Sequence, residues 1–167
     1  GLGLSNDGRG RGFLAPSASG QRRAIEAAYA GASLAPSAVS LLECHATGTT
    51  IGDATEIEST GAVYADCADV PIGSLKSNMG HLITTAGVAG LIKVLEAMRH
   101  QERPRTLHAE PLNPELQGSP FRVLTAHENW ESDGPRIAGV SAFGFGGNNA
   151  HLIVSEDDPA LEGPDVA

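Results

Sequence analysis

The chain has 167 residues, 41% of them hydrophobic, which is enough for a single globular domain with its own core. Its 11 basic and 20 acidic side chains give a formal net charge of −9, which argues against nucleic acid or an anionic membrane as a partner. Two cysteines are too few for a disulfide framework, and no segment resembles a signal peptide or a membrane span, so we expect a cytoplasmic location.

A helix and a strand are predicted in the first quarter of the chain. Helix formers with apolar residues at helical spacing indicate a helix over residues 19–33, and Ser17 or Ser19 can cap its first turn. A turn around Pro36 separates this helix from a buried strand at 38–44.

The middle of the chain continues this alternation. Asp53 and Glu56 have the spacing of a capping box, so a helix is predicted over 53–66 with Asp53 as its N-cap. A short strand at 70–76 follows, and a loop at 77–80 then leads into a long helix.

The long helix is expected from His81 to His100, and three strands complete the chain. These strands are expected at 121–125, 136–143 and 150–156. Strands that alternate with helices predict an α/β layered fold with a partly parallel sheet.

Three loops carry most of the chemistry-bearing side chains. The segments ECHATGTTIGD (43–53), LKSNMGH (75–81) and FGFGGNNAH (143–151) each begin where a predicted strand ends. This is where α/β folds collect their functional groups. We therefore expect the three loops to meet in one cleft.

The first loop offers an imidazole and two hydroxyls. Thr47 and Thr49 would alternate along an extended loop and could hold an amide-bearing ligand while His45 faces its reactive end. The alternative is a buried histidine satisfied by the backbone, with threonines that only cap the next turn. Cys44 is expected in the core, because neighbouring strand positions face opposite ways and Cys44 cannot readily pair with His45.

Lys76 and His81 flank the second loop. The positive end of the following helix disfavours a second positive charge, so His81 is expected to be a neutral hydrogen-bond donor. A buried Lys76 needs a carboxylate, and Glu56 on the preceding helix is the predicted partner. The alternative is a surface lysine and an ordinary histidine at a helix N-terminus.

Glycines surround Phe145 in the third loop. Gly144, Gly146 and Gly147 allow the backbone to turn so that the Phe145 N–H faces a developing oxyanion, although a simple hairpin is the alternative. A dinucleotide site is not indicated, because the segment after these glycines is strand-like and no GxGxxG opens a helix. A metal site is not expected either, because the histidines lack the short ligand pairs of metal motifs.

Four motifs, in their order and spacing, resemble the β-ketoacyl synthase (ketosynthase) domain of type I polyketide and fatty acid synthases, which are thiolase-fold condensing enzymes. The motifs are ECHATGT, GDATEIE, GSLKSNMGHL and AFGFGGNNAH. The combination looks most similar to iterative bacterial synthases, such as those for enediynes or polyunsaturated fatty acids.

The resemblance covers nearly the whole chain and implies the C-terminal half of a thiolase-like αβαβα layered fold. Residues 1–155 would form this half, and the acidic segment 156–167 would be a linker. Ketosynthases carry their nucleophilic cysteine in an earlier ACSS-type motif, and neither Cys44 nor Cys67 lies in such a setting. We therefore expect a piece of a longer protein, whose N-terminal half supplies the nucleophile and a homodimer contact.

The resemblance also implies a reaction, the decarboxylative condensation of an acyl thioester with malonyl-acyl carrier protein. His45 and His81 would stabilise the enolate that remains when carbon dioxide leaves, and Lys76 would orient the site. Thr47 and Thr49 would bind the phosphopantetheine arm of the acyl carrier protein, which carries the substrates, so that no cofactor is bound directly.

Phe145 would be a gating residue whose N–H completes the acyl oxyanion hole, with Gly144 and Gly146 letting its loop move. Two positions depart from the family pattern. Ala46 stands where the family has glycine, and Asn148 replaces a threonine, which would change a hydrogen bond beneath the gating loop. The alternative function is a non-catalytic condensing-enzyme-like subunit that binds carrier protein or shapes the chain pocket.

Overall fold

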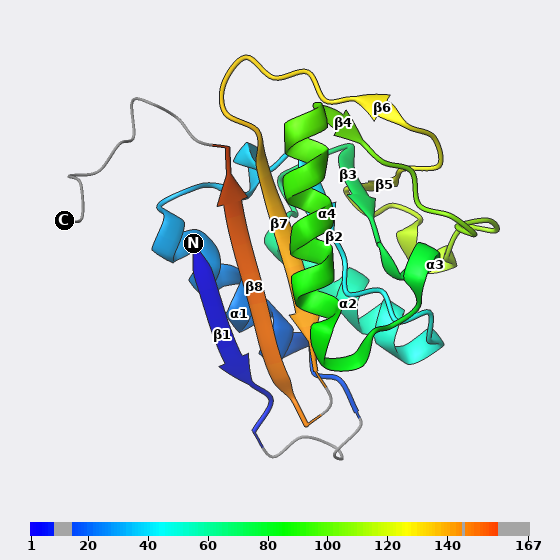
Figure 1. The fold of residues 1–167 in the computed structure, drawn as a ribbon. Coiled ribbons are helices and arrows are strands. Elements are labelled where there is room, and N and C mark those ends of the chain that lie inside the picture. The colour runs from blue at the N-terminus through cyan, green and yellow to red at the C-terminus, as the bar shows by residue number, and fades with distance from the viewer. Residues whose placement is uncertain (9–14, 145, 157–167) are drawn as a thin grey trace.

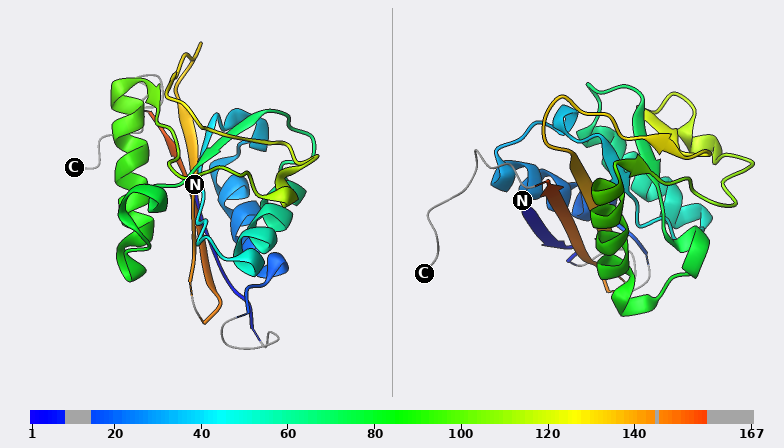
Figure 2. Two further views of the ribbon diagram at one scale, coloured as in Figure 1. Left: turned by 90° about the vertical axis from the view of Figure 1, so that its right-hand side faces the viewer. Right: turned by 45° about the horizontal axis from the view of Figure 1, so that its top comes forward.

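The computed structural model describes residues 1–8, 15–144 and 146–156. A six-stranded sheet forms the centre of this part of the chain. Helix α4 lies on one face of the sheet, and α1 and α2 lie on the other (Figures 1 and 2). The predicted α/β layered fold is confirmed.

The helices are α1 (Ala18–Ala32), α2 (Thr50–Val63), α3 (Lys76–Met79) and α4 (Ala86–His100). The strands of the main sheet are β1 (Leu2–Asn6), β2 (Leu41–Glu43), β3 (Val70–Gly73), β5 (Phe121–Val123), β7 (Ile137–Phe143) and β8 (Asn148–Ser155). A second, two-stranded antiparallel sheet consists of β4 (Glu102–Arg103) and β6 (Glu128–Asn129). No helix in the described ranges is long and apolar enough to cross a membrane.

The main sheet has the order β1-β8-β7-β2-β3-β5. Strands β7, β2, β3 and β5 are parallel neighbours, whereas β8 is antiparallel to both β7 and β1. The predicted partly parallel sheet is therefore confirmed. This order brings the carboxyl ends of β7, β2 and β3 together at one end of the sheet, and all three predicted functional loops begin there.

Apolar side chains fill both faces of the sheet. Leu41 belongs to the cluster under α4, together with Trp130, and Leu42 belongs to the cluster under α1 and α2, together with Ile25 and Tyr64. Neighbouring strand positions face opposite sides, so β2 buries one leucine on each face. Burial on both faces is typical of a parallel strand between two helical layers.

Helix α1 confirms the first helix prediction. Ser17 is its N-cap, and the Ser17 hydroxyl accepts a hydrogen bond from the Gly20 N–H (3.3 Å). The helix lies so close to β1 that a Cβ on Gly3 would lie 1.9 Å from the Ala24 carbonyl oxygen. Strand β1, which was not predicted, therefore depends on a glycine that allows this contact.

Helix α2 begins earlier than predicted. Its N-cap is Thr49 rather than Asp53, because Thr49 Oγ1 accepts a hydrogen bond from the Gly52 N–H (3.1 Å). Asp53 lies in the first turn and accepts from the Gly48 N–H (3.1 Å). The predicted capping box is wrong, because the Glu56 carboxylate reaches the loop before the helix instead.

The segment between β3 and α4 also differs from its prediction. Most of the predicted loop 77–80 belongs to the single turn of α3, and α4 begins at Ala86 rather than at His81. Leu82 and Ile83 have φ angles of 53° and 49°, in the left-handed region that interrupts a helix. His81 therefore lies outside α4, and the predicted influence of the α4 dipole on His81 is wrong.

Candidate active site

A cavity of about 1140 Å³ lies at the end of the sheet where the three loops begin. From the loop after β2 it is lined by His45, Thr47 and Thr49, and His81 reaches it from the segment before α4. Gly144 after β7 lines it as well. The predicted meeting of three loops at one cleft is confirmed.

The imidazoles of His45 and His81 lie next to each other in this cavity. Their ring centroids are 5.3 Å apart, and the ring planes meet at 85°. The ring of His45 also rests against the ring of Phe143 at 5.9 Å. Burial lowers the pKa of His45 to about 3, and the nearby Lys76 charge adds to this effect. His45 is therefore a neutral imidazole at physiological pH.

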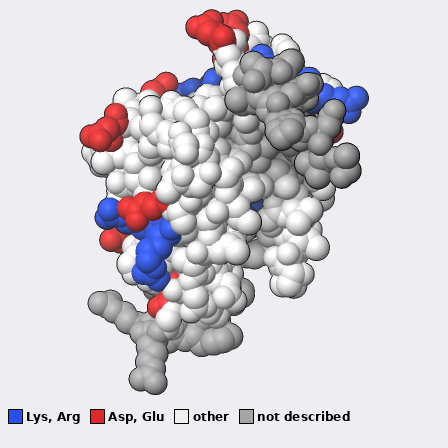
Figure 3. All heavy atoms as spheres, turned by 90° about the vertical axis from the view of Figure 1, so that its left-hand side faces the viewer, with Lys and Arg blue, Asp and Glu red and all other residues white. Residues whose placement is uncertain are grey.

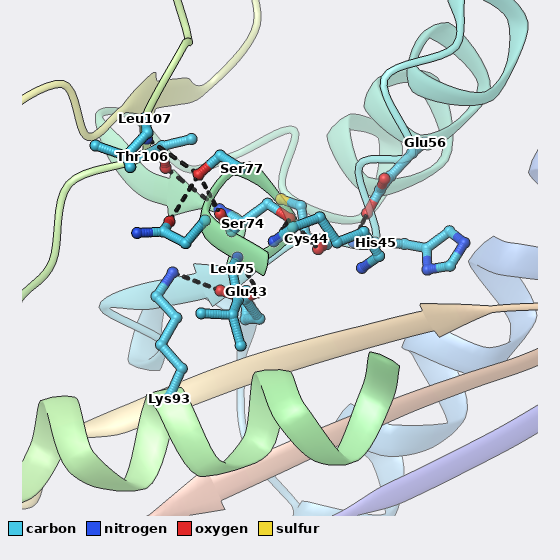
Figure 4. Close-up of polar contacts among 12 residues, drawn as sticks. Glu43, Cys44, His45, Glu56, Ser74, Leu75, Ser77, Lys93, Thr106 and Leu107 are labelled. Atoms are coloured by element: carbon cyan, nitrogen blue, oxygen red, sulfur yellow. Dashed lines mark hydrogen bonds and ion pairs between the residues drawn. The ribbon is translucent and has the colours of Figure 1, made fainter. Parts of the chain in front are cut away.

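Glu56 holds the backbone of the His45 loop from α2. Glu56 Oε1 accepts a hydrogen bond from the His45 N–H (2.7 Å), and Oε2 accepts one from the Ala46 N–H (2.7 Å) (Figure 4). Burial raises the pKa of Glu56 to about 7, although the two N–H donors oppose this shift. The carboxylate therefore holds the loop backbone at the residue that carries the His45 imidazole.

Two threonines follow His45 along the wall of the cavity. Thr47 Oγ1 and Thr49 Oγ1 are 3.1 Å apart, so one hydroxyl donates to the other. Thr49 also caps α2, which ties its position to the start of that helix. Thr49 therefore has the helix-capping role that was the alternative to ligand binding, and both threonines also line the cavity.

The loop after β7 is tied to the N-terminal segment. The Gly144 N–H donates to the Asn148 carbonyl oxygen (2.7 Å), and the Asp7 N–H donates to the Gly147 carbonyl oxygen (2.8 Å). Gly146 and Gly147 have φ angles of 83° and 77°, which favour glycine. Strands β7 and β8 pair antiparallel on either side of this segment, as in the simple hairpin that was the alternative, and the direction of the Phe145 N–H stays a prediction.

Comparison with known proteins identifies the family of this chain. Residues 1–110 match the family model described as beta-ketoacyl synthase, C-terminal domain. The chain belongs to the β-ketoacyl synthase family. Members of this ketosynthase family are condensing acyltransferases.

Relatives in polyketide synthases support this assignment. The chain is 43% identical to polyketide synthase ThaG of Burkholderia thailandensis over 180 residues, covering 96% of this chain and 3% of that protein. It is 45% identical to polyketide synthase GfsA of Streptomyces halstedii over 167 residues, covering 96% of this chain and 2% of that protein. The chain thus spans a small part of each relative. The finer likeness to iterative synthases stays a prediction.

Solved ketosynthases have the same fold. Ketosynthase twelve of the bacillaene polyketide synthase of Bacillus amyloliquefaciens matches with a TM-score of 0.90 and 40% identity, over 95% of this chain and 30% of that chain. The oxazolomycin ketosynthase domain OzmH KS7 of Streptomyces albus matches with a TM-score of 0.90 and 39% identity, over 98% and 30%. The predicted thiolase-like fold is confirmed, and the chain spans about 30% of these solved chains.

Lys76 of this ketosynthase segment has a different setting from the one predicted. The Glu56 oxygens accept from the backbone of the His45 loop, and within the described residues Glu56 forms no ion pair with Lys76. The predicted ion pair is therefore wrong. Lys76 is the first residue of α3, is partly buried, and does not line the cavity as described. Burial lowers the pKa of Lys76, and the Glu43 and Glu56 charges oppose this shift.

The sequence prediction missed a buried ion pair close to Lys76. Glu43 Oε2 accepts a hydrogen bond from Lys93 Nζ (2.6 Å), and Glu43 Oε1 accepts one from the Leu75 N–H (2.7 Å) (Figure 4). The side chains of Glu43 and Lys93 are only 3% and 10% exposed. A signal for the pair was present, because each charge interrupts an apolar segment and a buried charge needs a partner.

Three of the predicted residues need separate mention. Phe145 lies outside the described residues, so its gating role stays a prediction. Gly146 is described but is not among the residues that line the cavity. Asn148 lines it, and its Oδ1 accepts a hydrogen bond from Asn6 Nδ2 (2.9 Å).

The neighbouring Asn149 was not singled out from the sequence. Its side chain is buried, and Nδ2 donates to Asp7 Oδ1 (2.6 Å). This contact adds a second tie between the N-terminal segment and the loop after β7. The alternation of β8 could have indicated it, because Asn149 shares the buried face with Ile153.

Proposed function

We propose that the protein containing this chain is a β-ketoacyl synthase in polyketide or fatty acid chain elongation. It would condense an acyl thioester with malonyl-acyl carrier protein, with loss of carbon dioxide. The observation that carries this proposal is the pair of imidazoles, with ring centroids 5.3 Å apart in one cavity. Membership of the ketosynthase family supports it.

The two imidazoles suit the decarboxylation step. When carbon dioxide leaves a malonyl thioester, the electron pair of the broken bond moves into the thioester and places negative charge on its oxygen. Two N–H donors directed at this oxygen stabilise the enolate. The enolate carbon then attacks the acyl group on the cysteine, and the thiolate leaves. The neutral state of His45 supports its assignment as a donor that does not titrate near neutral pH.

The cavity wall supports a role for the two threonines. Thr47 and Thr49 present hydroxyls along the cavity, where they can bond the amides of a phosphopantetheine arm. The acyl carrier protein would deliver both substrates on this arm, and we propose no directly bound cofactor. Phe145, with Gly144 and Gly146, would complete the acyl oxyanion hole.

The nucleophile in this proposal comes from the N-terminal half of the ketosynthase. Neither Cys44 nor Cys67 is among the described cavity-lining residues, and burial raises the pKa of the Cys44 thiol. A thiol with a raised pKa is a poor nucleophile. The homodimer would likewise form through that half.

An exposed apolar surface supports this partner. On the face that carries α4, β1 and β8 have no helix over them (Figure 1). Leu2 and Leu4 of β1 are 60% and 67% exposed, and Val88 and Ile92 of α4 are 61% and 56% exposed. The side of the molecule at the β1 edge carries few charged groups (Figure 3). An exposed apolar surface of this kind is typical of an interface with another protein segment.

The proposal is tested with the full-length protein that contains this chain. His81→Ala should reduce carbon dioxide release from malonyl-acyl carrier protein by about 100-fold or more, while acylation of the cysteine continues. Intact-mass detection of a condensed product on the carrier protein tests the whole reaction. Unchanged carbon dioxide release in the variant would contradict the role of His81. An unaltered protein that binds carrier protein without any condensation would support a non-catalytic subunit.

A further inference from the structure

The buried ion pair between Glu43 and Lys93 joins three parts of the ketosynthase segment. Glu43 ends β2, two residues before His45, and Lys93 projects from the middle of α4. The second oxygen of Glu43 binds the backbone of Leu75, the residue directly before Lys76. The carboxylate therefore links the His45 strand, the Lys76 turn and α4 (Figure 4).

A glycine on α4 provides the space for the glutamate of this pair. A Cβ on Gly90 would lie 2.9 Å from Cγ of Glu43, whereas a Cβ on Gly73 would lie 3.4 Å from Lys93 Nζ, which is an ordinary contact distance. Contacts as short as the first do not occur between ordinary side chains, so Gly90 in particular allows the glutamate to lie against the helix. The surface of α4 at Gly90 is therefore fitted to the Glu43 side chain.

Several other hydrogen bonds hold the turn that carries Lys76. The Lys76 N–H donates to Ser74 Oγ (3.3 Å), and the Leu107 N–H donates to Ser77 Oγ (3.0 Å). The Ser74 N–H donates to Thr106 Oγ1 (3.2 Å). The backbone of the turn is thus fixed from several sides, whereas the Lys76 ammonium forms no ion pair within the described residues.

The charge of Lys76 interacts with two carboxylates, and each of them already has hydrogen-bond partners elsewhere. Glu43 and Glu56 each favour the charged state of Lys76, yet Glu56 is bound to two backbone N–H groups and Glu43 to Leu75 and Lys93. Lys76 in turn disfavours a proton on His45. If Lys93 were absent, Glu43 would keep a single hydrogen bond and would attract the Lys76 ammonium, the other cation whose charge acts on it.

We propose that Lys93 is a positioning residue of this ketosynthase: it occupies the Glu43 carboxylate, so that Glu43 anchors the turn at Leu75 without pulling the Lys76 ammonium toward itself. This inference rests on the proposed function, because it assigns Lys93 a part in placing Lys76, the lysine that is expected to orient the site. Lys93 acts through Glu43 and does not touch the reacting atoms.

The test uses four variants of the full-length protein that contains this chain. K93M removes the cation, E43Q removes the charge of the carboxylate but keeps an acceptor for Leu75, and E43Q/K93M removes both charges. K93R keeps the charge, and the adjoining cavity of about 270 Å³, which Lys93 lines, has room for the longer side chain. Carbon dioxide release, cysteine acylation and crystal structures are compared across the set.

We expect K93M to lower carbon dioxide release about 10- to 100-fold, because small displacements at a reacting centre have effects of this size. Acylation of the cysteine should change by less than about threefold, since this step uses the other half of the protein. In the K93M crystal structure, Lys76 Nζ should contact Glu43. K93R and the double variant should both release carbon dioxide at nearly the unaltered rate, because neither contains a carboxylate that lacks a cation.

A purely structural role for the pair gives the opposite pattern. The double variant would then be no better than K93M, since it lacks the same ion pair, and this result would overturn the inference. Lys76 at its original place in the K93M crystal structure would also overturn it. If the unaltered protein releases no carbon dioxide, the proposed function fails, and the K93M crystal structure alone then decides the inference.

Discussion

The loop after β2 and the turn after β3 are each held by one buried carboxylate, but the two carboxylates are satisfied differently. Glu56 accepts two backbone N–H groups, from His45 and Ala46, and contacts no cation within the described residues. Glu43 accepts one backbone N–H, from Leu75, and pairs with Lys93. The carboxylate at the His45 loop is therefore satisfied by the backbone of that loop alone, whereas the carboxylate that binds the Lys76 turn also has a cation from a distant helix as its partner.

The different partners of Glu56 and Glu43 determine how each carboxylate responds to substitution. Burial raises the pKa of both carboxyl groups. The Lys93 ammonium is the main opposing influence on the pKa of Glu43, whereas at Glu56 the two backbone N–H donors oppose the shift more than the Lys76 charge does. Removal of Glu56 leaves two N–H donors without their acceptor, whereas removal of Glu43 leaves one N–H donor and one cation without their partner. The two regions should thus respond differently to matched substitutions.

The largest expected effect follows from Glu56→Ala. Two partly buried N–H groups lose their acceptor, so the free energy of unfolding should fall by about 4 kcal/mol. Carbon dioxide release should fall about 100-fold as His45 loses its orientation. Urea denaturation and a decarboxylation assay of the full-length protein measure both quantities.

Glu58→Ala is the matched control for this prediction. Glu58 lies on the same helix, two residues further along, and is exposed. Its substitution should change the free energy of unfolding by less than about 0.5 kcal/mol. Equal effects of the two substitutions would show that the hydrogen bonds of Glu56 do not hold the His45 loop.

The second prediction concerns the loss of folding stability at acidic pH that His45 causes. Burial lowers the pKa of His45 from 6.5 to about 3, so between these values the unfolded chain binds a proton that the folded chain does not. Stability should therefore fall as the pH decreases from 6.5 toward 3. At pH 4 the contribution of His45 to this loss is about 3 kcal/mol, and His45→Asn should remove it.

Urea denaturation at pH 7.5 and pH 4 measures this change, and the variant should lose less stability than the unaltered protein. Nitrogen NMR of the imidazole provides a direct check. His45 should still show the signals of a neutral ring at pH 5. A protonated His45 at pH 5 would contradict both the burial of this ring and its assignment as a neutral donor.

These two regions also show which features can be predicted from a sequence. His45 and His81 could be placed in one cleft because the ends of neighbouring parallel strands meet, and the sequence contains both the strands and the polar residues that follow them. Helix α1 could be predicted because Ser17 and its apolar spacing are local signals. Strand β1 was missed, because its place depends on the contact of Gly3 with α1.

The partners of the charged groups could not be predicted in the same way. Glu43 and Lys93 are 50 residues apart, and their contact depends on the packing of α4 across the end of β2. The spacing of Asp53 and Glu56 predicts a capping box, in which Glu56 would accept from the Asp53 N–H. Because Thr49 is the N-cap instead, the Glu56 carboxylate accepts from the His45 and Ala46 N–H groups. Spacing in the sequence indicates which charged residues could form pairs, but tertiary packing determines which of them are in contact.

The smallest expected effect tests how tightly Glu56 holds its loop. Ala46 has a φ angle of 34°, on the side of the map that favours glycine, and its N–H is bound by Glu56. Ala46→Gly should relieve about 1 to 2 kcal/mol of backbone strain and cost about 1 kcal/mol of unfolded-chain entropy, for a net gain of about 0.5 kcal/mol. Ala54→Gly, inside α2, should instead lose about 1 kcal/mol.

Ala46→Gly also tests the origin of the left-handed conformation at Ala46, which is imposed either by the hydrogen bonds to Glu56 or by the flanking chain. If the two hydrogen bonds impose the left-handed conformation, the loop relaxes in Glu56→Ala, and adding Ala46→Gly there should bring no gain. If the gain persists in the double variant, the conformation comes from the flanking chain, and Glu56 only binds a shape that already exists. Urea denaturation of the unaltered protein, the two single variants and the double variant decides between these outcomes, because only the first makes Glu56 the source of the geometry around His45.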